Sequence, residues 1–425
     1  MARIAMTPPM GWNSWDCYGA GVTEDIVKAN ADYMASKLKN YGWEYVVVDI
    51  QWSVASAVNH EYSQFSDFCM DEYGRLIPAE NKIPSSAGGK GFKPLADYVH
   101  SLGLKFGIHI MRGIPRMAVY NKCKVLGSFE GKEYMASDAA NAYDICEWNP
   151  DMYGIKTDSP ASQLYYDSIF KLYAEWGVDY IKIDDIARDY PVKEVEMVAK
   201  ALKNSGREMV LSLSPGPAKL EEAEHLKTHA NMWRITDDFW DQWELLYAMF
   251  ERAEKWCTHS GPGHWPDADM LPIGALRMDY PEGKHETGFT EEEQKTMFTL
   301  WCIMRSPMMM GGDMVHNDEF TEKLLTKASI LEMLTKGRSS HQVYKRKEND
   351  SEVIVWSAVC SEGGKYLAVF NTGEKDAEFS VSLEECEVEY FVKSLDLWNE
   401  KEITVSDGIL KACVKSHGAA CYKFY

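Results

Sequence analysis

Aspartate residues end four of the short apolar segments in this chain of 425 residues. A single aspartate after a strand is typical of a helix N-cap, but four such segments in one chain favour a shared site. Two carboxylates facing each other across a pocket, one ionised and one protonated, are what cleavage of a glycosidic bond requires. The candidates are Asp49, the pair Asp184 and Asp185, the pair Asp237 and Asp238, and the pair Asp267 and Asp269.

A lysine inside an apolar segment is a second chemical signal. Lys182 lies two residues before Asp184, and the period of two along a strand places both side chains on one face. Because lysine is unusual in a buried strand, we expect Lys182 to face the site and to keep it polar. The 14 Trp and 23 Tyr residues suit a sugar ligand, although aromatic content more commonly reflects core packing.

These residues must be positioned by the elements around them. Over the first 320 or so residues, short apolar segments alternate with amphipathic helices that stop at Gly42, Gly103 and Gly177 or start at the capping box of Thr290 and Glu293. Such alternation predicts a parallel sheet covered by helices. About eight units predict an α/β fold, a (β/α)8 TIM barrel over 1–335, whose strands end at one common edge. The expected strands are 10–15, 45–50, 105–110, 179–186, 209–214, 232–237, 263–270 and 308–313.

Two further segments complete the expected organisation. The polar stretch 53–90 is expected to be a long rim loop between the second strand and its helix. After about residue 338 the helical periodicity disappears, and 353–359, 366–371 and 378–383 have the pattern of strands. We therefore expect a C-terminal antiparallel β-sandwich over 336–425.

Composition excludes several classes of protein. Lys and Arg total 45 against 65 for Asp and Glu, a net charge of −20, so no nucleic-acid partner is expected. No apolar run approaches the ~20 residues that span a bilayer, so no membrane partner is expected either. Residues 1–9 show no apolar signal-peptide segment, and the ten cysteines contain no CxxC pair. These features predict a cytoplasmic protein with mostly free thiols, and an oligomer is possible.

Motifs along nearly the whole chain resemble those of glycoside hydrolase family 27, the family of α-galactosidases and α-N-acetylgalactosaminidases. Any one of them is weak evidence, but they occur in order and with the spacing of barrel strands. They are an opening PPMGWNSW at 8–15, GLKFGI at 103–108, WGVDYIKID at 176–184, WRITDD at 233–238, GPGHWPDADML at 261–271 and HGA at 417–419.

The resemblance implies a retaining exo-glycosidase that works by double displacement through a covalent glycosyl-enzyme. By that resemblance Asp184 is the nucleophile and Asp238 the general acid/base. No metal or organic cofactor is implied, and no His/Cys/Asp cluster with metal-ligand spacing argues otherwise. The residues implied to hold the terminal sugar are Trp15, Asp49, Lys182, Arg234, Asp269 and Met270.

The chain departs from the family pattern at positions that would determine which terminal sugar is bound. Ile50 replaces a second carboxylate after Asp49, and strand three ends with His109 and Arg112 in place of the usual Tyr-Ser/Ala-Asp. Ser214 lies where galactosidases have Glu. Arg112 either replaces the missing sugar contact or pairs with a carboxylate at the rim. We include Ile50, His109, Arg112 and Ser214 among the expected substrate-binding residues.

These departures do not change the predicted type of reaction, but they leave the identity of the sugar undetermined. The expected substrate is an oligosaccharide or glycoside with a terminal α-D-galactoside, or a close relative of it. α-N-acetylgalactosaminides remain an alternative because Ser214 leaves room at C2, and β-L-arabinopyranosides because Ile50 suits a sugar without a hydroxymethyl group. A different class of protein, a catalytically silent sugar-binding protein, is disfavoured because both Asp184 and Asp238 are present.

Overall fold

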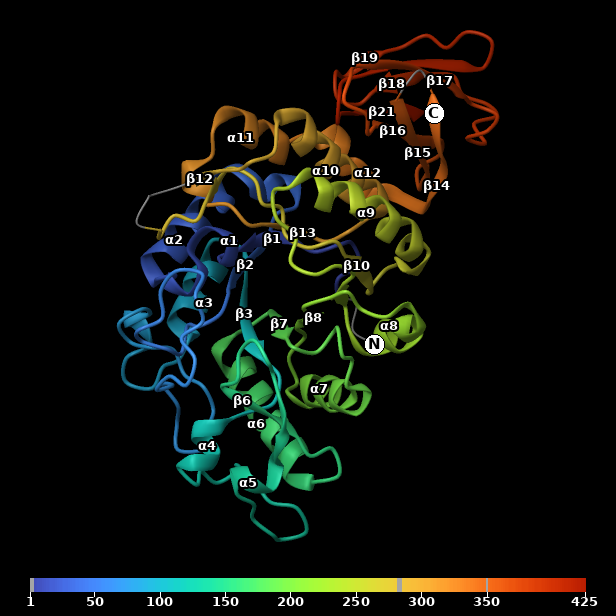
Figure 1. Ribbon diagram of the computed structural model, residues 1–425. Helices are drawn as coiled ribbons and strands as arrows, with labels where there is room; N and C mark the ends of the chain where they lie inside the picture. The colour runs from blue at the N-terminus through green and yellow to red at the C-terminus, as the bar shows by residue number, and fades with distance from the viewer. Residues whose placement is uncertain (1–3, 281–284, 349–350) are drawn as a thin grey trace.

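The structure is a computed structural model that describes residues 4–280, 285–348 and 351–425 (Figure 1). The first nine residues, on which the expectation of no signal peptide depends, lie partly outside this range. Helices and parallel strands extend to α12 (Ala328–Lys336), and antiparallel strands follow from β14 (Gly337–Glu348). The two parts are described in turn.

Eight parallel strands form one sheet in the order β10-β9-β8-β7-β3-β2-β1-β13. A parallel bridge between Leu271, just after β10, and Met310 of β13 joins the two ends of this order, so the sheet closes into a barrel. Each strand coincides with one of the expected segments, with β3 one residue longer than expected, and the predicted TIM barrel is confirmed. The strands are β1 (Met10–Asn13), β2 (Tyr45–Val48), β3 (Lys105–Met111), β7 (Tyr180–Asp184), β8 (Val210–Leu213), β9 (Met232–Arg234), β10 (Trp265–Asp267) and β13 (Met308–Met310).

Helices follow the strands and cover the outside of the barrel (Figure 1). Two of the glycines expected to end helices do so. Gly177 follows α6 (Pro160–Trp176) with a φ of 83°, and Gly42 has a φ of 98°. Residues other than glycine rarely adopt such positive φ values. Thr290 and Glu293 form the predicted capping box. The helices are α1 (Trp15–Tyr18), α2 (Glu24–Tyr33), α3 (Lys93–Ser101), α6 (Pro160–Trp176), α7 (Val192–Asn204), α8 (Ala223–His229), α9 (Trp243–Trp256), α10 (Glu291–Met304) and α11 (Glu319–Leu325).

Two long excursions leave the barrel on the side of the first strands. The expected loop runs between β2 and α3 without a long helix. A second excursion, between β3 and α6, was not expected: it forms a small sheet in the order β4-β6-β5 and appears at the bottom of Figure 1. Its elements are β4 (Ile114–Pro115), α4 (Arg116–Tyr120), α5 (Ala136–Ala139), β5 (Ala140–Ile145) and β6 (Met152–Ile155).

The C-terminal part is the predicted antiparallel β-sandwich. One sheet has the order β14-β15-β16-β21-β18-β19, and the other pairs β17 with β20. The first strand of this part, β14, was not expected because its sequence is polar and it lies at a sheet edge. The other strands are β15 (Ser351–Cys360), β16 (Lys365–Asn371), β17 (Ala377–Ser382), β18 (Ser394–Asp396), β19 (Lys401–Glu402), β20 (Ile409–Val414) and β21 (Ala419–Phe424); a short hairpin of β11 (Ala275–Leu276) and β12 (His285–Glu286) belongs to the barrel.

The large sheet of the sandwich is apolar on both faces. Along β15, Val353 and Val355 face the second sheet, whereas Ile354 and Trp356 belong to the same hydrophobic core as the barrel. Successive side chains of a strand point to opposite faces, so one strand serves both cores. Phe370 of β16 extends this contact and packs edge-to-face on a phenylalanine of α9, with ring centroids 4.9 Å apart.

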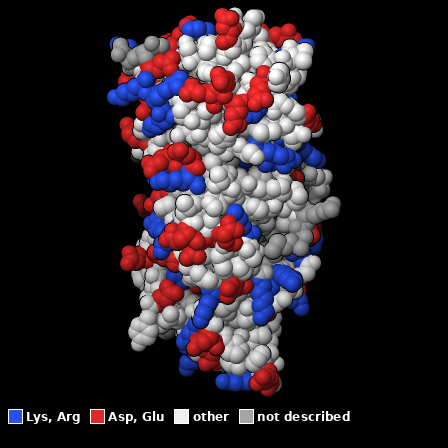
Figure 2. Space-filling view, turned by 90° about the vertical axis from the view of Figure 1, so that its right-hand side faces the viewer, with Lys and Arg blue, Asp and Glu red and all other residues white. Residues whose placement is uncertain are grey.

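Two properties of the structure concern association with membranes and nucleic acids: the length and polarity of its helices, and the distribution of charge on its surface. Among the described residues, no helix is both long enough and apolar enough to cross a membrane. On the face shown in Figure 2, acidic and basic side chains are interspersed and form no continuous basic surface.

We predict that barrel and sandwich unfold together because they share a core. Phe370→Ala should lower the free energy of unfolding by about 3–5 kcal/mol, as for other buried phenylalanines. The exposed Val359 of β15 provides a control, and Val359→Ala should change it by less than about 0.5 kcal/mol. Denaturant unfolding followed by circular dichroism measures both. Two separate transitions in the unmodified protein would contradict the shared core.

Candidate active site

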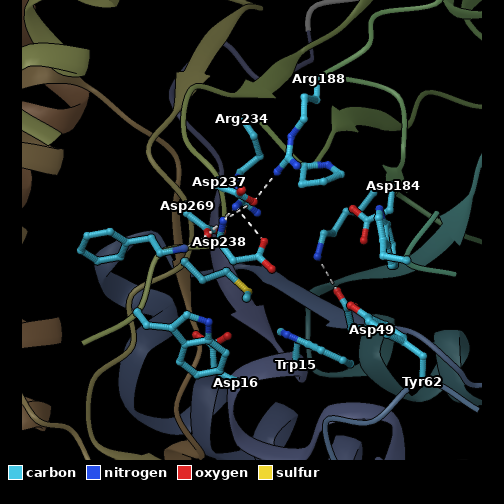
Figure 3. A pocket seen from close by; sticks show the side chains of 16 residues that line it. Trp15, Asp16, Asp49, Tyr62, Asp184, Arg188, Arg234, Asp237, Asp238 and Asp269 are labelled. Atoms are coloured by element: carbon cyan, nitrogen blue, oxygen red, sulfur yellow. Dashed lines mark hydrogen bonds and ion pairs between the residues drawn. The ribbon is translucent and has the colours of Figure 1, made fainter. Parts of the chain in front are cut away.

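A pocket of about 270 Å³ opens at the carboxyl ends of the barrel strands (Figure 3). It is strongly charged, with more acidic than basic side chains. Eight of the twelve predicted site residues line it: Trp15, Asp49, Lys182, Asp184, Arg234, Asp238, Asp269 and Met270. The other lining residues are Asp16, Tyr62, Trp148, Arg188, Pro215, Asp237, Phe239 and Trp240.

Asp184, the last residue of β7, is the most firmly held carboxylate. Ser214 Oγ donates a hydrogen bond to its Oδ1 at 2.5 Å, and His109 Nε2 lies 2.9 Å from its Oδ2 in a bent contact. Burial alone would raise the pKa of Asp184, but the nearby Lys182 ammonium and His109 hold this pKa well below its usual range. Asp184 is therefore ionised, with both oxygens oriented by neighbours.

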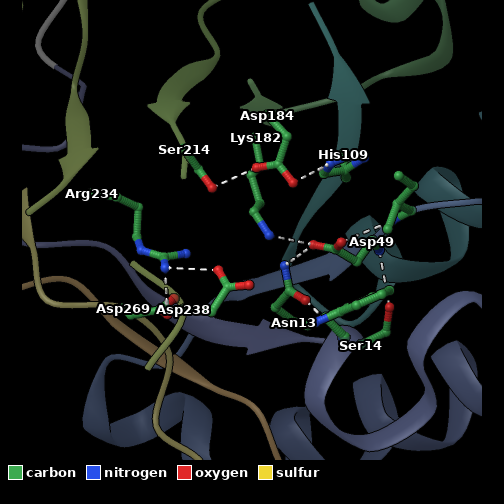
Figure 4. A network of polar contacts seen from close by, with 12 residues as sticks. Asn13, Ser14, Asp49, His109, Lys182, Asp184, Ser214, Arg234, Asp238 and Asp269 are labelled. Atoms are coloured by element: carbon green, nitrogen blue, oxygen red, sulfur yellow. Dashed lines mark hydrogen bonds and ion pairs between the residues drawn. The ribbon is translucent and has the colours of Figure 1, made fainter. Parts of the chain in front are cut away.

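Lys182 forms an ion pair with Asp49, the residue that follows β2, and lies near Asp184 (Figure 4). Its Nζ donates to Asp49 Oδ2 at 3.0 Å, and Asn13 Nδ2 donates to the same oxygen at 2.7 Å. Lys182 is buried, which disfavours its charge, but Asp184 and Asp49 raise its pKa above the usual value. Despite burial, Lys182 likewise lowers the pKa of Asp49. The result is a largely enclosed cation that contacts one buried anion, Asp49, and stabilises a second, Asp184, through its charge.

Arg234, the last residue of β9, organises the opposite side of the pocket. Its Nη2 lies 2.7 Å from Asp269 Oδ2 and 3.1 Å from Asp238 Oδ1. Burial raises the pKa of Asp269 to about 7, against the opposing effect of Arg234 and with a further contribution from Asp238. Asp269 adopts a φ of 82°, and its Oδ2 also accepts the backbone N–H of Phe239 at 2.8 Å. Asp269 is thus fixed at a backbone geometry that is uncommon for aspartate.

The two proposed catalytic carboxylates differ most in their exposure. The side chain of Asp238 is 60% exposed, whereas that of Asp184 is 11% exposed. The neighbour of each has another partner: Asp237, itself a lining residue, pairs with Arg188, and Asp185 Oδ2 lies 3.0 Å from Arg112 Nε. The pocket therefore presents one enclosed anion and one carboxyl group that solvent or a leaving group can reach.

Aromatic rings form one wall of the pocket. Trp15 and Tyr62 stack with centroids 5.4 Å apart and planes 10° apart, and Tyr62 contacts Trp148 at 5.1 Å. Ring faces suit the C–H-rich faces of a sugar. Near them, burial and the charge of Asp269 raise the pKa of Asp16 well above its usual value.

Four predicted sugar ligands do not line the pocket. His109 and Ser214 lie directly behind it and contact Asp184. Ile50 is buried in a small apolar cluster on which Trp15, Tyr62 and Trp148 pack.

The fourth, Arg112, is directed toward carboxylates outside the pocket lining. It donates hydrogen bonds to Asp144, Asp185 and Glu194. This is the arrangement expected if Arg112 pairs with rim carboxylates, and these contacts occupy the donors that a sugar would need.

Several lining residues were absent from the sequence prediction. Tyr62 and Trp148 come from the two excursions, whose paths no periodicity reveals. Asp16 and Trp240 lie one and two residues from predicted site residues, Trp15 and Asp238. Asp16 and Trp240 could have been predicted only from this closeness to the motifs in the sequence. Arg188 follows β7 by four residues and carried no signal of its own.

Comparisons with known proteins identify the family of the chain. A family model described as alpha galactosidase A matches residues 7–153 and 151–334, and one for the alpha galactosidase C-terminal beta sandwich domain matches 350–424. Alpha-galactosidase 2 of Arabidopsis thaliana is 26% identical over 99% of this chain and 89% of its own length.

Two bacterial structures are more similar. A family 27 β-L-arabinopyranosidase from Geobacillus stearothermophilus is 51% identical, with a TM-score of 0.93 over 99% of this chain and 96% of its own. A provisionally assigned α-N-acetylgalactosaminidase from Bacillus halodurans is 44% identical, with a TM-score of 0.86 over 100% and 98% of the two chains.

The family models together match far more than half of the chain, in both its barrel and its sandwich. The matched barrel contains the strands that carry Asp184 and Arg234, and the matched sandwich follows it in this chain. The chain therefore belongs to glycoside hydrolase family 27, the α-galactosidase family, and is a glycoside hydrolase.

Proposed function

We propose that this chain is a retaining exo-glycosidase that releases a terminal sugar of the configuration shared by α-D-galactopyranosides and β-L-arabinopyranosides. The observation that carries the proposal is the asymmetry of two carboxylates in one pocket. Asp184 is enclosed and kept ionised by Lys182, whereas Asp238 is largely exposed beside Arg234. Retaining glycosidases divide their two carboxylates in this manner.

In the first step, Asp184 Oδ attacks the anomeric carbon while the bond to the leaving oxygen breaks. Asp238 gives its proton to that oxygen, so the aglycone departs as an alcohol and the sugar remains as an ester of Asp184. In the second step, Asp238 takes a proton from water, and the resulting hydroxide displaces Asp184 from the sugar. Asp184 thus returns to its ionised state and Asp238 to its protonated state.

The size of the pocket supports action on a single terminal residue. At about 270 Å³, it lies just below the usual range of ligand pockets, ~300–1,000 Å³. The wall of Trp15, Tyr62 and Trp148 closes one side, while Asp49, Lys182 and Asp269 offer charged partners for hydroxyl groups. One pyranose ring is therefore the expected occupant.

Ile50 supports a preference for the arabinopyranoside. β-L-arabinopyranose equals α-D-galactopyranose without the hydroxymethyl group. Ile50 lies behind the wall of Trp15, Tyr62 and Trp148, so it offers that group's hydroxyl no hydrogen bond from this side, where an aspartate would place a carboxylate. The surroundings of Ile50 are also apolar, because it packs in one cluster with Met111, Cys146 and Met152. The similarity to the Geobacillus stearothermophilus β-L-arabinopyranosidase supports the same choice.

An α-N-acetylgalactosaminide is the second candidate, because the Bacillus halodurans relative carries that provisional assignment. A C2 acetamido group would have to fit beside Ser214 and Pro215. The hydroxyl of Ser214 is engaged with Asp184, which leaves it less free to serve the substrate.

We also propose that the enzyme acts in a reducing compartment, as expected of a cytoplasmic protein. All ten cysteines lie in the described part of the chain and are free thiols. Cys413 is exposed, and such a thiol is prone to oxidation outside reducing surroundings.

Replacing the proposed nucleophile gives the first functional prediction. Asp184→Gly should abolish hydrolysis of a nitrophenyl glycoside, and added azide should restore release of nitrophenol with formation of a glycosyl azide. Asp185→Asn is the matched control and should retain turnover, because Asp185 faces Arg112 instead of the pocket. Equal loss in both variants, or no rescue by azide, would contradict the assignment, and no turnover by the unmodified chain would favour a silent sugar-binding protein.

Replacing the proposed acid/base should have an effect that depends on the leaving group. Asp238→Ala should reduce kcat/KM by ~10²–10⁴-fold on alkyl glycosides, the usual contribution of general acid catalysis. The reduction should be much smaller on dinitrophenyl glycosides, which depart without a proton. Asp237→Ala, the adjacent pocket residue, should show no such dependence. An equal loss on both classes of substrate would assign the role elsewhere.

Comparison of three nitrophenyl glycosides tests the substrate. The unmodified enzyme should have a higher kcat/KM for the β-L-arabinopyranoside than for the α-galactoside or the α-N-acetylgalactosaminide. Ile50→Asp should shift the ratio toward the α-galactoside by ~10–100-fold, since a hydrogen bond to a charged group contributes about 1.5–3 kcal/mol. Ile50→Val keeps the site apolar and should preserve the ratio. An unchanged ratio in a folded Ile50→Asp variant would refute this role of Ile50.

A further inference from the structure

Two histidines and a glutamate meet on the outer wall of the barrel, outside the pocket described above. His225 and His229 lie one turn apart on α8, and Glu196 lies on the neighbouring helix α7 (Figure 1). One ligand atom from each residue lies within 4.8 Å of the other two. None of the three lines the active-site pocket.

The hydrogen bonds of the two rings leave the same nitrogen available on each. Nδ1 of His225 lies 2.7 Å from the hydroxyl of Tyr190, and Nδ1 of His229 lies 2.9 Å from the carbonyl oxygen of His225. Metal-bound histidines are typically held in this way, through the nitrogen that does not bind the metal. In both rings the remaining nitrogen is Nε2.

The third side chain supplies a negative charge next to these nitrogens. Glu196 Oε1 lies 3.5 Å from His225 Nε2, at the limit of a hydrogen bond. The rings of His225 and His229 stack with centroids 4.0 Å apart. The Glu196 side chain is 53% exposed and that of His225 is 22% exposed, so the carboxylate can adjust while the imidazole is fixed. Because its hydrogen bond to His225 is weak, the carboxylate of Glu196 can still bind a cation.

We propose that Glu196, His225 and His229 bind a divalent transition metal ion of the Zn²⁺ type, which links α7 to α8. Two imidazoles and one carboxylate match the ligand preferences of Zn²⁺ and of neighbouring transition metals, whereas Ca²⁺ and Mg²⁺ select oxygen ligands. Three protein ligands leave one position for water. Zn–N distances of ~2.0–2.1 Å require the three ligand atoms to lie close together, and the half-exposed Glu196 side chain can adjust its position to this requirement.

Sequence alone did not indicate this site, and its topology explains why. Two histidines separated by four residues share one helix face, but the pair lacks a third ligand within α8. Glu196 precedes His225 by a whole β/α unit. The barrel brings them together because consecutive helices pack side by side on its outer wall.

Titration of the full chain with Zn²⁺ alone, after dialysis against a chelator, tests the proposal. Calorimetry should give one Zn²⁺ per chain and no binding of Ca²⁺. Co²⁺ should give a visible spectrum of nitrogen and oxygen ligation without the near-ultraviolet band of a thiolate. Tyr190→Phe, which removes the partner of a ligand, should weaken binding by ~10-fold, and His229→Ala should weaken it further.

The controls separate this site from other metal-binding groups. His341→Ala on β14 and Cys413→Ala, both at exposed positions, should bind Zn²⁺ like the unmodified chain. Unchanged glycoside hydrolysis without added metal shows that a variant is folded, and Glu196→Gln provides a second test at an exposed position. Absence of stoichiometric binding would overturn the proposal. So would binding that survives both His229→Ala and Glu196→Gln, or that depends on Cys413.

Discussion

The proposed nucleophile depends on one cation, the ammonium of Lys182, which pairs with Asp49 and lowers the pKa of Asp184 through its charge. A pocket this small concentrates six aspartates against three basic side chains. A carboxylate that is buried without a partner either lowers the stability of the fold by several kcal/mol or takes up a proton. Lys182 keeps the pKa values of Asp49 and Asp184 low, and without it the reacting anion would not persist in this enclosure.

The barrel makes this arrangement possible by strand order. Lys182 and Asp184 lie two residues apart on β7, and Asp49 follows β2, with β3 between these strands in the sheet. His109 comes from that intervening β3 and reaches Asp184 from the side. Arg234 and Asp269 come from the region of β9 and β10, farther around the barrel. Each half of the site therefore has its own cation, and the substrate space lies between the halves.

Much of this could be predicted from the sequence because the barrel has a strong periodic pattern. All eight strands and the positions of Asp49 and Asp184 at their ends followed from apolar segments and spacing, whereas Asp238 lies four residues beyond the end of β9. The excursion at 114–155, the strand β14 and the aromatic partners Tyr62 and Trp148 did not. Loop paths depend on tertiary packing instead of periodicity, and an edge strand such as β14 need not be apolar. Arg112 illustrates a third limit: its residue type suited two roles, and only its three carboxylate partners distinguished them.

The central claim is that Asp184, stabilised as an anion by Lys182, becomes covalently bound to the sugar. It is tested most directly by incubating the enzyme with an activated fluorosugar of the preferred configuration, which forms the intermediate faster than it is hydrolysed, followed by mass spectrometry of peptides. The account predicts a mass increase of one glycosyl unit located on Asp184, with slower labelling in Lys182→Met. A glycosyl unit on another residue, or complete turnover with inversion and no labelled peptide, would contradict it.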